Sequence, residues 1–158
     1  MKRFYIFWVV VLMCLFGNVH QAQAQTSEFK KFMEAYTGVE SITVMDVSSA
    51  MLRMAGFGAN DKDAKELLSQ LNRLVVITNE NGFAGLALEL EKVFQKGEYE
   101  VLTSITEGGS KTKICVKSGS RGENELVVLN TSGKKTVIVC VVGKLSVDQM
   151  MNISSGLL

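Results

Sequence analysis

The sequence contains no proline, and its single histidine, His20, lies in an apolar segment near the N-terminus. Without proline, no cis-proline turn can form, and proline isomerisation cannot slow folding. If the N-terminal segment is removed, no histidine remains in the chain. Its removal would exclude histidine general bases, Ser-His-Asp triads and histidine-ligated metal sites.

The first 24 residues have the pattern of a cleaved secretory signal. Lys2 and Arg3 precede an apolar run over residues 4–16, and the sequence Ala-Gln-Ala follows at residues 22–24. This order predicts export, with cleavage before Gln25. A membrane anchor is the alternative, but the apolar run is shorter than the roughly 20 residues that span a bilayer.

The mature chain that this cleavage would leave has 134 residues, enough for one domain with a hydrophobic core. Loss of two of the 17 basic residues leaves 15 against 16 acidic ones, a net charge of −1. No basic stripe is present, so nucleic-acid binding is not expected. No other apolar run is long enough to cross a bilayer, so we expect no membrane span after cleavage and a periplasmic or secreted protein.

The C-terminal half predicts an antiparallel β-meander. Four runs rich in β-branched residues alternate with polar turns that contain glycine, a pattern typical of hairpins. Val101 and Ile105 are expected to share one face of the first strand. The third and fourth runs are apolar on both faces. The four predicted strands are residues 99–106, 111–117, 125–130 and 135–142.

Two cysteines of the mature chain, Cys115 and Cys140, lie on the second and fourth predicted strands. If the strands pair in sequence order, about two strand spacings separate the two residues, which is beyond the reach of a disulfide. We therefore predict two unpaired thiols. A different strand order would allow the disulfide.

The N-terminal half predicts a succession of helices and strands from its apolar periodicity. A strand at residues 73–78 contains four consecutive apolar residues and is expected at the centre of the sheet, buried on both sides. Ser146 and Gln149 have the spacing of a capping box at the start of a last helix. The other predicted elements are helices at 28–36, 60–71 and 83–95, a helix from Asp46 or Ser48 to about residue 55, and a strand at 41–45.

Helices and meander segregate along the chain, which is typical of an α+β fold. We predict a single domain over residues 25–158. Its mixed sheet would end in the C-terminal four-stranded antiparallel meander, with the helices packed mainly on one face.

The N-terminal half is rich in methionine, with Met33, Met45, Met51 and Met54. We expect these side chains in the core. The alternative is an adaptable, apolar binding groove, because methionine is flexible and polarizable.

The second strand of the meander carries the sharpest surface feature. Lys111, Lys113, Cys115 and Lys117 alternate with apolar residues and therefore point to one face. These four residues form the predicted interaction surface. An alternative is that the two flanking lysines lower the pKa of the Cys115 thiol and make it a nucleophile. A purely structural explanation is that this is a solvated strand face, on which the lysines prevent an exposed edge from pairing with other chains.

Asp61, Asp63 and Glu66 are close in sequence but lack the spacing of a calcium-binding loop. Favourable charges in a first helical turn explain them. No catalytic, cofactor-binding or metal-binding residue is predicted, and no cofactor is expected.

A set of segments along the chain carries a resemblance to a known family. They are the signal segment and residues 29–36, 41–44, 48–52, 74–77, 99–102 and 137–143. In these segments the chain resembles a family of small exported bacterial proteins known as domain of unknown function 4252. The resemblance implies a secreted or periplasmic α+β domain of Gram-negative bacteria and supplies no catalytic residues. It also implies gene neighbours that encode extracytoplasmic sigma factors, and hence a role in envelope signalling.

These features together predict an exported, non-enzymatic envelope protein that binds a partner, either an envelope protein or a small ligand. One alternative is a binder of small apolar ligands, with a pocket between the methionine-rich helices and the sheet. Another is a thiol-dependent enzyme or redox protein that uses Cys115.

Overall fold

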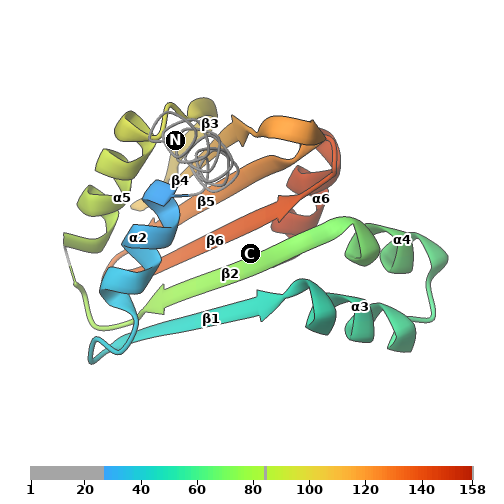
Figure 1. Ribbon diagram of the computed structural model, residues 1–158. Helices are drawn as coiled ribbons and strands as arrows, with labels where there is room; N and C mark the ends of the chain where they lie inside the picture. The colour runs from blue at the N-terminus through green and yellow to red at the C-terminus, as the bar shows by residue number, and fades with distance from the viewer. Residues whose placement is uncertain (1–26, 84, 158) are drawn as a thin grey trace, which may run out of the picture.

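The computed structural model describes residues 27–83 and 85–157 (Figure 1). The predicted signal segment and the cleavage site before Gln25 lie outside these residues. No helix of the described ranges is long and apolar enough to cross a membrane. The elements are α2 (Ser27–Tyr36), β1 (Ile42–Ser48), α3 (Ser49–Gly58), α4 (Lys62–Gln70), β2 (Leu71–Asn79), α5 (Gly85–Lys96), β3 (Glu100–Glu107), β4 (Ser110–Ser118), the 3₁₀ turn η1 (Ser120–Gly122), β5 (Asn124–Ser132), β6 (Lys135–Gly143) and α6 (Val147–Leu157).

The predicted α+β fold is confirmed, and its centre is one six-stranded sheet with the order β1-β2-β6-β5-β4-β3. Strands β3 to β6 form the predicted meander in sequence order. The sheet is antiparallel throughout, not mixed as predicted. The reason is the connection between β1 and β2: α3 leads away from the end of β1, and α4 returns, so β2 starts beside that end (Figure 1).

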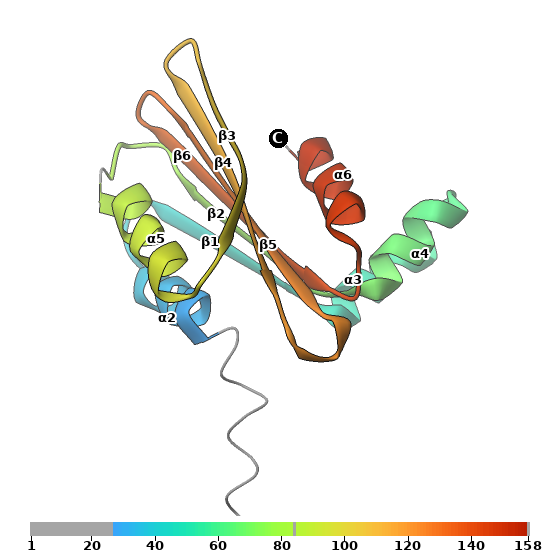
Figure 2. The same cartoon turned by 90° about the horizontal axis from the view of Figure 1, so that it is seen from above.

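Helices cover both faces of the sheet, which corrects the expectation that they pack mainly on one. Figure 2 shows α2 and α5 on one side, here called the front face, and α6 on the other, the rear face. The apolar strands explain this arrangement, because β5 and β6 bury consecutive residues and so require cover on both sides. The internal strand β2 is fully buried at Val75 and Ile77 toward the front and only partly at Leu74 and Val76 toward the rear.

A β-bulge between Val101 and Thr103 changes the pattern of the first meander strand. Val101 lies opposite Cys115, whereas Ile105 lies opposite Thr112. Because Cys115 and Thr112 point to opposite faces of β4, Val101 and Ile105 do not share a face as predicted. The extra residue in the bulge interrupts the period of two, and the sequence carries no clear signal for it.

Helix starts follow local signals closely. Ser48 caps α3, accepting a hydrogen bond from the Met51 amide, and Asp61 caps α4 through the Asp63 amide. The predicted capping box of α6 is confirmed, since Ser146 Oγ accepts from the Gln149 amide and Gln149 Oε1 from the Ser146 amide. The cap on α4 gives Asp61 a structural role, and Asp63 lies in the first turn of the helix, where an acidic side chain is favourable.

Candidate functional site

The lysine-bearing face of β4 lies beneath α5 and is not an open surface. The Lys113 ammonium forms an ion pair with Glu91 of α5 at 2.6 Å and lies 5.6 Å from the centre of the Phe94 ring. Lys117 lies over the Tyr99 ring at 5.5 Å, and Cys115 is fully buried. The predicted interaction surface is corrected accordingly: Cys115 cannot take part in it, and Lys111 is its only fully exposed member.

The environment of Cys115 opposes thiolate formation. Burial raises the pKa of the thiol to about 11, and Lys113 reverses this effect only in part. Glu91 raises the pKa further. A nucleophilic cysteine needs an accessible thiol with a lowered pKa. The structure therefore does not give Cys115 the lowered thiol pKa that the thiol-enzyme alternative assumes.

The prediction of two unpaired thiols is confirmed, since Cys115 and Cys140 are both free and buried. Val127 of β5 lies between them, in register with each. The in-order meander thus places an entire strand between the two sulfur atoms.

A buried polar cluster lies beside these cysteines on the front face and was not predicted from the sequence. Glu125 of β5 is only 4% exposed. The Tyr99 hydroxyl donates a hydrogen bond to Glu125 Oε1 at 2.6 Å, and Cys140 Sγ donates to the same oxygen at 3.7 Å. Lys117 lies directly opposite Glu125 on β4. The one sequence signal for this cluster was a single acidic residue, Glu125, next to the apolar run of β5.

Burial raises the pKa of Glu125, while the hydrogen bonds from Tyr99 and Cys140 lower it in part. The neighbouring charges of Lys117 and Arg73 act in the same direction as the hydrogen bonds. Burial is also the main cause of the raised pKa values of Tyr99 and Cys140. The Tyr99 hydroxyl and the Cys140 thiol both donate to the buried carboxyl of Glu125, so the three polar groups satisfy one another as in a structural cluster.

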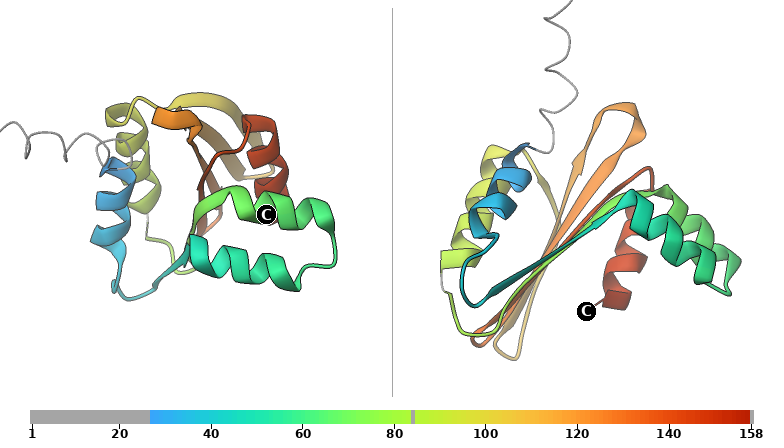
Figure 3. Two further views of the ribbon diagram at one scale, coloured as in Figure 1. Left: turned by 45° about the vertical axis from the view of Figure 1, so that its right-hand side comes forward. Right: turned by 60° about the horizontal axis from the view of Figure 1, so that its bottom comes forward.

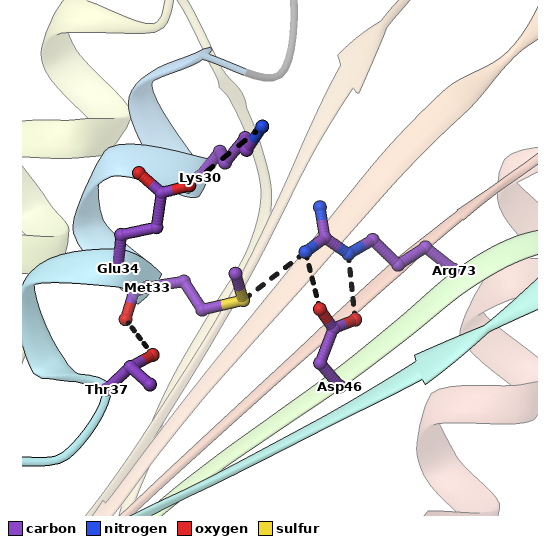
Figure 4. Close-up of polar contacts among 6 residues, drawn as sticks. All are labelled: Lys30, Met33, Glu34, Thr37, Asp46 and Arg73. Carbon is purple, nitrogen blue, oxygen red and sulfur yellow. Dashed lines mark hydrogen bonds and ion pairs between the residues drawn. The ribbon is translucent and has the colours of Figure 1, made fainter.

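Arg73 of β2 joins three elements at the edge of the same face (Figure 4). Its guanidinium binds both carboxylate oxygens of Asp46 on β1, at 2.9 and 2.6 Å, and donates to the Met33 sulfur of α2 at 3.6 Å. The hydrogen bond to Arg73 lowers the pKa of Asp46. A bidentate ion pair of this kind holds β1 against β2.

Apolar side chains are instead exposed along α3. Met51, Met54 and Phe57 are 59%, 71% and 79% exposed, respectively. Their spacing of three residues places them on one side of the helix, here called the α3 stripe. Leu52 and Gly56 form the buried side of α3. The expectation that the methionines lie in the core is therefore wrong for Met45, Met51 and Met54, which are exposed, and correct for Met33, which is buried. Met51 and Met54 do not lie between helix and sheet.

The position of α3 explains the exposure. Helices α3 and α4 form a hairpin that extends beyond the end of the sheet (Figure 3), and α4 has no fully buried residue. One side of α3 is used by α4 and the sheet edge, where Leu52 joins the rear core. The opposite side faces away from both. Exposed, clustered apolar side chains of this kind mark interaction sites.

Comparison with known protein families identifies a family for this chain. A search of curated proteins found no match. A model of the family described as "Domain of unknown function (DUF4252)" matches residues 36–153, a range that includes the α3 stripe, β4 and the Glu125 cluster. The predicted resemblance is thereby confirmed, and the chain belongs to this family of domains of unknown function.

Proposed function

We propose that the protein is an exported, non-enzymatic envelope protein that binds a protein partner through the α3 stripe. The observation that carries this proposal is the exposure of Met51, Met54 and Phe57 on one side of a projecting helix. We extend the proposal to envelope signalling, because of the gene neighbours that the family resemblance implies.

The energetic basis is the burial of apolar surface. Complete burial of a methionine or phenylalanine side chain stabilises a complex by about 1.5–3 kcal/mol. The α3 stripe already holds its three side chains on a folded helix, so a partner need not order this segment. Methionine adapts its shape to the surface it meets, which suits an apolar segment of a second protein.

A protein segment fits this surface better than a small apolar ligand does. Sites for small ligands are concave and enclose most of the ligand. The α3 stripe is instead exposed to solvent. It belongs to a hairpin that projects beyond the end of the sheet (Figure 3). A partner that lays an apolar helix or strand along α3 would cover all three side chains at once.

The absence of catalytic candidates supports the non-enzymatic part of the proposal. Residues 25–158 contain no histidine, and Cys115 is closed to solvent with a raised thiol pKa. Within residues 27–83 and 85–157, no three histidine, cysteine or acidic side chains are placed to hold a metal ion. The signal-like N-terminal segment supports export.

Site-specific photo-crosslinking in intact cells tests the proposal. A benzophenone amino acid is placed at position 51, 54 or 57 in turn, with Leu88 as the matched control, because Leu88 is a similarly exposed apolar residue on α5. We expect one and the same protein from all three stripe positions and not from position 88. Equal capture from position 88 would contradict the proposal.

The captured protein then provides a quantitative test. Met54→Glu should raise the Kd for the purified partner about tenfold or more, because it places a charge in the centre of the apolar contact. Leu88→Glu should leave the Kd unchanged. Equal binding by the Met54→Glu variant, with its fold intact by circular dichroism, would refute a role for the stripe.

A further inference from the structure

We infer that two copies of this chain pair through the free edge of β1, as antiparallel strands related by a two-fold axis at Met45. Strand β1 is the terminal strand of the sheet, and Figure 1 shows no described element beside its outer edge. An open edge presents unpaired backbone groups that can bind another strand. This inference does not require the proposed function, because it rests on the edge of β1 and not on the α3 stripe.

The edge at β1 lacks the devices with which proteins protect open edges. Its seven residues include no lysine, arginine or proline, and its register with β2 is continuous. Its one charged residue, Asp46, is already paired with Arg73 on the front face. The opposite edge differs, because β3 carries a bulge and has Glu100 and Glu107 at its ends. By this comparison β1 is the edge suited to pairing.

The sequence of β1 is compatible with pairing to itself. In a pair centred on Met45, Asp46 lies opposite Val44 of the second copy, and no like charges face one another directly. The two Met45 side chains lie opposite each other on the same face, at the close spacing of cross-strand pairs. Met45 is 55% exposed in the single chain, so pairing would cover both side chains.

The same symmetry brings opposite charges together. The strand pairing itself ends with β1, because Ser41 has a positive φ of 71° and α3 begins at Ser49. Pairing of Ile42 with Ser48 of the second copy would still bring the turn at Glu40 close to Ala50, in the first turn of α3 of that copy. Arg53 follows Ala50 by about one helical turn. Glu40 and Arg53 are both exposed, and within the described residues neither forms an ion pair. The two-fold axis would create this contact twice.

Disulfide trapping tests the register. A Met45→Cys variant of the mature chain is oxidised mildly and analysed without reductant. We expect a covalent dimer, because residue 45 is the one position of the strand that faces its own copy. Thr43→Cys, exposed on the same face, should link poorly, because it faces Val47 of the second copy. The native thiols are buried and should not compete.

Charge reversal provides a second test, read by sedimentation velocity. Glu40→Arg and Arg53→Glu should each raise the dimer Kd about tenfold, and the double variant should restore it, because two exposed ion pairs are lost and regained. A mature chain that sediments as a monomer at every concentration, with no linkage at position 45, would overturn the inference. A dimer that links through Met51→Cys instead would also overturn it.

Discussion

The lysine-bearing face of β4 and the methionine-bearing side of α3 are placed opposite to what their composition suggests. Lys113 and Lys117 lie against aromatic rings beneath α5, whereas Met54 and Phe57 face outward. The long apolar stems of lysine cover the rings while the ammonium groups reach Glu91 or remain near solvent. Burial therefore follows from what packs on each element, and residue type alone does not decide it.

The largest effect is expected when a phenylalanine is replaced in each of the two regions. Phe94→Ala removes the ring beneath Lys113 in the front core and should lower the free energy of unfolding by about 3–5 kcal/mol. Phe57→Ala, on the α3 stripe, should change it by about 0.5 kcal/mol or less. Urea unfolding followed by circular dichroism measures both. Comparable losses in the two variants would show that the stripe is part of the core.

A smaller effect is expected at the buried cluster next to the lysine face. Tyr99→Phe removes the hydroxyl that donates to Glu125 and leaves a buried carboxylate oxygen with a weaker partner. The expected loss is about 1–3 kcal/mol in the free energy of unfolding at neutral pH. Tyr36→Phe is the control, because its ring packs at the edge of the same core against Phe83. A Tyr99→Phe variant as stable as the control would show that the hydrogen bond from Tyr99 to Glu125 does not stabilise the fold.

The smallest effect is a pH dependence that belongs to Glu125. Its pKa is raised in the folded protein, so the carboxyl ionises less readily there than in the unfolded chain. Its contribution to stability is complete at pH values below the unfolded pKa and decreases as the pH rises through the folded pKa. Glu125→Gln should therefore match the natural protein in acid and gain relative stability toward neutral pH. Thermal unfolding of both proteins across this pH range measures the difference in stability. If Glu125→Gln were more stable than the natural protein only in acid, the pKa of Glu125 would be lowered on folding and not raised.

Much of the fold follows from local signals in the sequence. The glycine-containing turns predict the meander, and Ser146 with Gln149 predicts the start of α6. The antiparallel return through α3 and α4 was not predicted, because no local pattern shows that two helices form a hairpin. The bulge between Val101 and Thr103 was likewise not predicted, because the sequence carries no clear signal for it.

The candidate site was harder to predict for a related reason. Glu125 meets Tyr99, a residue 26 positions earlier, only once β3 and β5 lie in the same sheet. The exposure of Met51 and Met54 depends on α3 projecting past the end of the sheet. Apolar periodicity indicates that a helix has an apolar side, and it does not indicate whether the protein itself covers that side.

Competitive thiol labelling tests the central contrast between the covered lysine face and the open α3 stripe most directly. The mature Met54→Cys variant is treated with iodoacetamide under native conditions and then analysed by peptide mass spectrometry. We predict rapid labelling at position 54 and none at Cys115 or Cys140 until the protein is unfolded, because both native thiols are buried with raised pKa values. Labelling of Cys115 at a rate comparable to position 54 would contradict the account.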